Sequence, residues 1–178
     1  MPNVLKTYVR WVDAFNRAVG RFVMYVLLFA MMGILLYSTI AGPVFDRYPI
    51  WSVEMAQFVM AAYYLLGGGY SMQLQGHVRM DVLYSRWSPR TQAMINTVTN
   101  LLLIFYLVIL LSGAVSGIDY ALEYNQRNYT AWAPPLAPIK IIMGIGILMM
   151  LLQSLSTVVK DIAVIRGEPI EEGELVNE

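Results

Sequence analysis

Two ionisable residues stand inside long apolar stretches of this 178-residue chain, and they are its first candidates for chemistry. Glu54 lies near the start of the stretch 50–76, and Lys140 lies near the start of the stretch 139–159. A charged side chain is costly in hydrocarbon, so such residues mark candidate functional sites. Because both lie at a similar depth, we expect them to form an ion pair that ties the two stretches together. The alternative is that each side chain reaches separately to the membrane interface.

Glu54 also supports the hypothesis of a proton carrier. A carboxyl group removed from water can bind and release a proton near neutral pH, as a proton-coupled transporter requires. The chain would then be a small autonomous transporter. A cationic partner such as Lys140 at the same depth would instead keep the carboxylate ionised, which disfavours this alternative.

The segment HVRMD contains a third set of candidates, His77, Arg79 and Asp81. A His–Asp pair can activate a nucleophile, but the sequence has no nucleophile motif such as GxSxG. We therefore interpret the segment as a cytoplasmic turn that satisfies helix ends and contacts lipid phosphates. The chain is not expected to be an enzyme.

The composition excludes several other kinds of chemistry. The chain has no cysteine, which rules out disulfides and iron–sulfur ligation, and its single histidine cannot supply the ligands of a typical haem or zinc site. Twelve basic residues balance twelve acidic ones, and no nucleotide loop or nucleic-acid motif is present. We expect no cofactor, no metal and no nucleic-acid partner.

The elements that position these residues are apolar helices. The chain is 58% apolar and 13% charged, with a mean hydropathy of +0.56, which is typical of an integral membrane protein. Four stretches are long enough to cross a bilayer, at about 22–42, 50–76, 91–118 and 139–159, and the third is expected to run on toward Tyr124. The predicted fold is all-α integral membrane, a single four-span domain over residues 1–178 with an acidic cytoplasmic tail at 166–178.

The positions of lysine and arginine predict the orientation of the spans. Only Arg47 and Arg127 lie on one side of the predicted membrane. Nine basic residues lie on the other side, so the positive-inside rule places both termini in the cytoplasm. These nine are Lys6, Arg10, Arg17, Arg21, Arg79, Arg86, Arg90, Lys160 and Arg166.

Residues 4–21 form an amphipathic arm before the first span. Tyr8, Val12, Phe15 and Val19 recur at helical spacing, while charged residues repeat on another face. We predict a helix that lies in the membrane interface and binds lipids of the inner leaflet. The alternative is a simple cytoplasmic extension of the first span. The predicted anchoring residues are Lys6, Arg10, Trp11, Arg17 and Arg21.

Glycines inside the spans predict close helix contacts. Small residues let helices approach one another in lipid, where packing replaces the hydrophobic force. They indicate contact faces either inside the four-helix unit or toward a partner. The glycines concerned are Gly67, Gly68 and Gly69 in the second span, Gly113 and Gly117 in the third, and Gly144 and Gly146 in the fourth.

The runs at 51–89 and 130–153 together resemble the small membrane subunit (DctQ-like) of tripartite ATP-independent periplasmic (TRAP) transporters. The likeness spans nearly the whole chain, including the four-span count, the GHVRMD segment and the PPLAPIK run before the last span. The matched positions, which we interpret as structural or partner-facing, are Trp51, Glu54, His77, Arg79, Asp81, Trp132, Pro135 and Lys140.

The resemblance implies a transporter of the bacterial cell inner membrane with three components. A large multi-span subunit would hold the substrate and sodium sites and move as an elevator, and a periplasmic substrate-binding protein would deliver an organic acid. The present chain would be an accessory scaffold that braces the large subunit. Its outer connections could dock the binding protein through Arg47, Tyr48, Glu123 and Arg127. A membrane anchor for an enzyme complex is a further alternative, although most such anchors carry redox ligands that this chain lacks.

Overall fold

The computed structural model describes residues 3–45, 49–74 and 89–165, and these segments form four α-helices. The helices are α1 (Asn3–Phe45), α2 (Trp51–Gln73), α4 (Pro89–Glu123) and α5 (Ala137–Ile165). The all-α prediction is therefore confirmed for the described part of the chain. As expected, α4 continues beyond residue 118, and α5 begins directly behind the proline-rich segment.

Three helices are long and apolar enough to cross a membrane: Thr7–Val44 within α1, Met94–Glu123 within α4, and all of α5. In α2, the polar Glu54 and Gln57 and the glycine triplet interrupt the apolar character of its 23 residues. At 1.5 Å per residue α2 still reaches about 35 Å, enough to cross the hydrocarbon core. The fourth crossing and the cytoplasmic location of both termini stay predictions.

The amphipathic arm and the first span are one continuous helix. α1 runs unbroken for 43 residues, so the prediction of a separate interfacial helix at 4–21 was wrong. The physical reason lies in packing: Val9, Val12, Asp13 and Asn16 are buried on one face of α1, and hydrogen bonds join that face to α5. These contacts hold the arm in line with the span.

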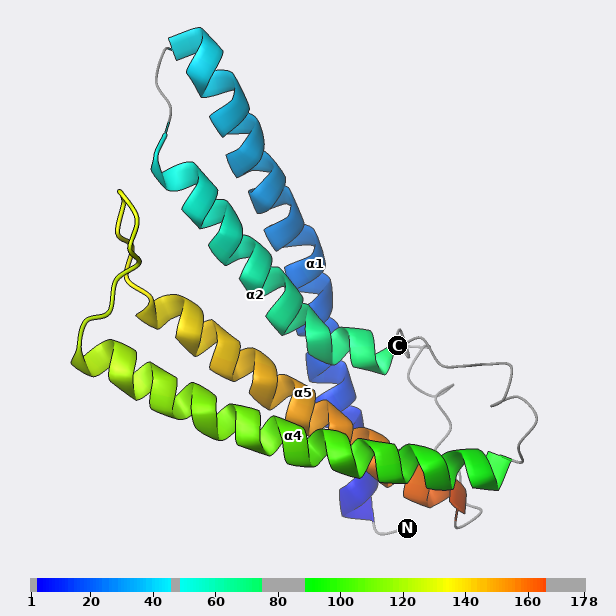
Figure 1. The fold of residues 1–178 in the computed structure, drawn as a ribbon. Coiled ribbons are helices and arrows are strands. Elements are labelled where there is room, and N and C mark those ends of the chain that lie inside the picture. The colour runs from blue at the N-terminus through cyan, green and yellow to red at the C-terminus, as the bar shows by residue number, and fades with distance from the viewer. Residues whose placement is uncertain (1–2, 46–48, 75–88, 166–178) are drawn as a thin grey trace.

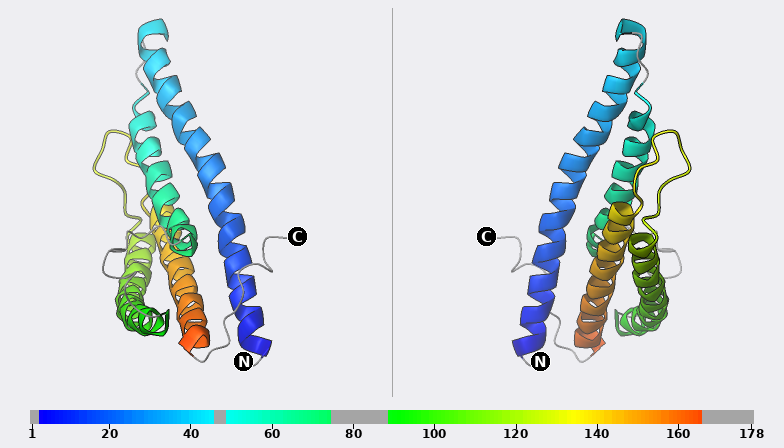
Figure 2. Two further views of the ribbon diagram at one scale, coloured as in Figure 1. Left: turned by 90° about the vertical axis from the view of Figure 1, so that its right-hand side faces the viewer. Right: turned by 90° about the vertical axis from the view of Figure 1, so that its left-hand side faces the viewer.

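The helices form two antiparallel pairs, α1 with α2 and α4 with α5 (Figure 1). α5 also contacts α1 and α2, and it lies between α1 and α4 (Figure 2). The pairs cross at the N-terminal part of α1 and diverge toward the connection 124–136 (Figure 1). Asp13 of α1 bonds to α5 in the first of these regions. We call the first region the crossing end and the second the open end.

The apolar core within the chain is small. Leu107 and Ala114 of α4 pack with Ile147 of α5. α2 approaches α5 closely at Gly146, where an added Cβ would lie 2.7 Å from the carbonyl oxygen of Leu65. Most other large apolar side chains face outward, as expected of helices surrounded by lipid or by partner helices.

Candidate functional site

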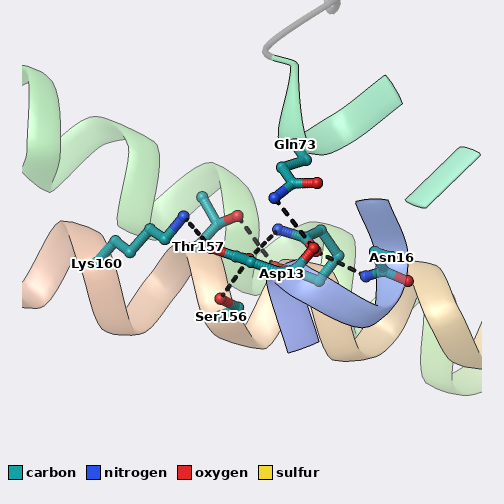
Figure 3. Close-up of polar contacts among 7 residues, drawn as sticks. Asp13, Asn16, Gln73, Ser156, Thr157 and Lys160 are labelled. Atoms are coloured by element: carbon teal, nitrogen blue, oxygen red, sulfur yellow. Dashed lines mark hydrogen bonds and ion pairs between the residues drawn. The ribbon is translucent and has the colours of Figure 1, made fainter. Parts of the chain in front are cut away.

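A buried polar network holds the helices together at the crossing end. At its centre Asp13 of α1 is only 1% exposed, and its Oδ2 atom lies 2.6 Å from the Nζ atom of Lys160 of α5. Gln153 Nε2 donates to Asp13 Oδ1 at 2.9 Å, and Ser156 Oγ donates to the same oxygen at 3.2 Å (Figure 3). The carboxylate is thus enclosed by three side chains from α5.

The network continues from Asp13 along α1 and into α2. Asn16 Nδ2 donates to Gln153 Oε1 at 2.7 Å, and Gln73 Nε2 donates to the backbone carbonyl oxygen of Asp13 at 3.3 Å (Figure 3). Asp13 and Asn16 share one helix face because they lie three residues apart, and the same spacing places Gln153 beside Ser156. Three helices therefore meet through side-chain hydrogen bonds at a single point.

The electrostatics of this network depend on the pairing of Asp13 with Lys160. A carboxylate away from water is strongly destabilised unless a cation and hydrogen-bond donors surround it. Lys160 supplies the charge while remaining 21% exposed, and Gln153 and Ser156 supply donors. These contacts join Asp13 of α1 to three side chains of α5, so the network fixes how the two helices are placed along each other.

A further polar contact brings α4 into the same region. Asn100 Nδ2 of α4 donates to Asp161 Oδ2 of α5 at 3.3 Å. Asp161 directly follows Lys160, so adjacent residues of α5 reach α4 and α1. The last part of α5 is consequently bonded to both α1 and α4, and α2 joins the region through its bond to α1.

The predicted bridge between Glu54 and Lys140 does not form. Lys140 Nζ instead donates to the carbonyl oxygen of Gly117 at 3.1 Å and to Gln126 Oε1 at 2.7 Å. The reason is the rotation of α5: Lys140 lies on the same helical face as Ile147, which packs against α4. Its amine therefore points to the end of α4, while Glu54 belongs to α2.

Glu54 is 6% exposed, and its Oε2 atom has no hydrogen-bond partner among the described residues. It lies in the first turn of α2, where free backbone N–H groups and the helix dipole favour a carboxylate. Nearby, Ser52 Oγ lies 2.9 Å from Ser38 Oγ and joins the ends of α2 and α1. Glu54 is thus buried, and one of its carboxylate oxygens accepts no hydrogen bond from the described residues.

The glycines named from the sequence fall into two groups. Gly68 and Gly69 lie at helix contacts, because added Cβ atoms would lie 2.9 Å from Met150 Sδ and 3.3 Å from Asn16 Oδ1. Cβ atoms added at Gly67, Gly113 and Gly117 would meet nothing within 4 Å in the part of the chain that the structure describes. The GxxxG pair on α4 is therefore open to neighbours outside the chain.

The other predicted site residues lie apart from the network. Trp11 is exposed on α1 and stacks on Phe15, with ring centroids 5.7 Å apart. Arg10 and Arg21 are exposed on the same helix, Arg17 is half-buried, and Lys6 lies in its first turns. Glu123 and Arg127 are exposed near the connection 124–136. The predictions for Arg47, Tyr48, His77, Arg79 and Asp81 fall outside the described residues.

Reasoning from the sequence did not single out the residues of the buried network. Two signals could have indicated them. Asp13 is the only acidic residue in the basic arm 4–21, and the polar run QSLST at 153–157 interrupts the apolar sequence of the last helix. A polar run in one apolar helix and a single acidic residue among basic residues in another together predict a contact between the two helices.

Comparison with known proteins identifies the family of the chain. The chain matches the family described as "Tripartite ATP-independent periplasmic transporters, DctQ component" over residues 31–164, which is well over half of its length. The matched range includes α2, α4 and Lys160, whereas Asp13 precedes it. No individual curated protein matches the chain. The family resemblance seen in the sequence is thus confirmed, and the chain belongs to the DctQ component family of tripartite ATP-independent periplasmic transporters.

Proposed function

We propose that this chain is the scaffold subunit of a sodium-driven importer of organic acids in the bacterial inner membrane. In this proposal a large multi-span subunit carries the substrate and sodium ions, and a periplasmic binding protein delivers the substrate. Membership of the family supports the general role, since that family is a transporter component. The positive-inside pattern supports cytoplasmic termini and, with them, a cytoplasmic location of the crossing end.

The arrangement of polar and apolar side chains is the observation that carries the scaffold role. The charged and amide groups of the crossing end turn toward one another, whereas large apolar residues of α1 and α4 turn outward. Examples are Phe29 on α1 and Leu102 on α4, both exposed. Internal bonds that fix the helices, combined with outward apolar faces, suit a frame against which a moving subunit is held.

The scaffold role can be tested with purified components. The tagged chain is expected to extract from the membrane together with the large subunit in equal amounts. Proteoliposomes that contain both subunits should take up an organic acid when sodium and the binding protein are supplied, and omission of this chain should abolish uptake. Full uptake by the large subunit and binding protein alone would contradict the proposal.

We further propose that the connections at the open end contact the binding protein. Glu123 and Arg127 are exposed there. The positive-inside pattern of the sequence supports a periplasmic location for these residues and for Arg47 and Tyr48. The reversal Arg47→Glu should weaken binding-protein affinity and uptake while leaving the subunit in the membrane. Unchanged uptake with Arg47→Glu would argue against docking through that residue.

Glu54 supports a second candidate function, that of a proton-coupled transporter formed by this chain alone. The supporting observation is that Glu54 is buried and that its Oε2 atom has no hydrogen-bond partner among the described residues. Proteoliposomes of the lone chain should then move a cation in response to a pH gradient, and Glu54→Gln should stop that movement. Under the scaffold proposal the lone chain moves no cation, whether residue 54 is glutamate or glutamine.

A further inference from the structure

A groove of about 350 Å³ lies at the open end, where the two helix pairs diverge. Its walls are formed by Phe58, Val59 and Ala62 of α2 on one side and by Pro135 and Ile142 on the other. We propose that this groove binds an acyl chain of a phospholipid and that Arg127 at its rim binds the lipid phosphate. This inference does not depend on the proposed transport function.

The lining of the groove favours a hydrocarbon occupant. Almost all of its surface is apolar, and neighbouring wall residues Leu27 and Ile139 belong to helices that are apolar enough to cross a membrane. Water is poorly stabilised in such a groove, because it finds almost no polar groups there with which to form hydrogen bonds. In a bilayer the immediate source of an apolar chain that can enter between two helix pairs is the lipid itself.

The rim of the groove complements the head of a phospholipid. Trp132 lines the groove and is 40% exposed, which suits an amphipathic ring at the level of the headgroups. Arg127 forms a backbone bridge with Pro135, a residue of the groove wall, so the cation is attached directly beside the opening. Arginine binds phosphate oxygens through paired N–H groups.

The charge of Arg127 is available for such a ligand. Its side chain is exposed, and within the ranges 3–45, 49–74 and 89–165 no acidic group forms an ion pair with it. The backbone around it is fixed, because Asn128 N donates to Pro134 O at 3.0 Å and Leu136 N donates to Gln126 O at 2.9 Å. The site therefore combines a cation, which has no ion-pair partner among the described residues, with an apolar groove beside it. A phospholipid is complementary to this combination, because its phosphate is attached to acyl chains.

The test uses the full chain in bilayer nanodiscs of phosphatidylethanolamine and phosphatidylglycerol that contain a trace of phosphatidylglycerol with a photoactivatable acyl chain. After illumination, mass spectrometry of peptides locates the adducts. The exposed residues Leu101 and Leu102 of α4 report contact with bulk lipid. Adducts at 55–62 and 134–142 are expected to exceed those on this face of α4.

Two variants that fill the groove from opposite walls, Val59→Phe and Ile142→Phe, should lower adducts in the groove to the level of α4. The matched control Val108→Phe adds the same ring on the outward face of α4 and should change nothing. Size-exclusion chromatography shows whether each variant is folded. Because the two variants fill the groove independently, either one is a sufficient test if the other misfolds. Arg127→Gln should reduce groove adducts of the phospholipid but not those of a diacylglycerol with the same photoactivatable chain.

Three results would overturn the inference. The first is equal labelling of the groove and α4 that neither phenylalanine variant changes. The second is loss of groove labelling when the large subunit is present, which would show that a protein side chain fills the space. The third is an Arg127→Gln variant with unchanged lipid adducts but weakened affinity for the binding protein, which would assign that cation to protein docking.

Discussion

The crossing end and the open end of this subunit use polar residues in opposite ways. At the crossing end Asp13 is surrounded by a cation and donors from another helix, and the helices there are bonded to one another. At the open end Glu54 has a buried oxygen that bonds to none of the described residues, and Lys140 bonds to a carbonyl oxygen and an amide. The chain therefore fixes one end by itself and leaves the other to be completed by its surroundings.

The largest effect is expected from removal of the cation at the crossing end. Lys160→Met leaves the Asp13 carboxylate buried without its charge partner, which should lower the free energy of unfolding by about 3–5 kcal/mol. Unfolding in mild detergent, followed by tryptophan fluorescence, measures this loss. Replacement of both partners, as in Asp13→Leu with Lys160→Met, should recover most of it. No recovery in the double variant would mean that Asp13 and Lys160 act separately.

Close packing between the helix pairs should show the next largest effect. Gly146→Ala places a methyl group against the carbonyl of Leu65, so the backbones must separate, at a cost of about 1–3 kcal/mol. The matched control Gly113→Ala meets no atom within 4 Å and should be neutral or stabilising by about 0.5–1 kcal/mol, because alanine favours the helix. Thermal unfolding of the two variants in the same detergent gives the comparison.

The open end should show little coupling between its two charged residues. Glu54→Gln and Lys140→Met are each expected to cost about 1 kcal/mol or less, through the helix dipole and lost hydrogen bonds respectively. Their double-mutant cycle should give an interaction energy below about 0.5 kcal/mol, since no bridge joins them. A coupling as large as that of Asp13 with Lys160 would contradict the geometry and restore the bridge predicted from the sequence.

The smallest effect is a gain of stability in the connection at the open end. Ala133 has a φ of 48°, a left-handed conformation that costs an alanine more than a glycine. Ala133→Gly should therefore stabilise the chain by up to about 1 kcal/mol, or leave it unchanged if the added freedom of the unfolded chain offsets the relief. Differential scanning fluorimetry suffices to detect the shift, and a clear decrease in melting temperature would show that the strain is absent.

The approximate positions of α2, α4 and α5 and the family were predictable from the sequence because they depend on local information. Uncharged runs define where spans lie, and the prolines before residue 139 indicate where α5 begins. The pairing of charges was not predictable in the same way. The positions of Glu54 and Lys140 along their spans predicted a similar depth in the membrane. The rotation of α5 about its axis, however, turns Lys140 toward α4. The buried network was missed because an amphipathic pattern does not show which polar residue faces another helix.

The long sequence separation within the buried network has a consequence for how the chain is made. Gln153 follows Asp13 by 140 positions, and its helix is the last of the four to be synthesised. During translation α1 therefore enters the membrane with a carboxylate whose partners do not yet exist. The network can close only after α5 has been made, because α5 supplies the three side chains around Asp13. A chain that stops before α5 therefore leaves the Asp13 carboxylate without the side chains that surround it in the folded protein.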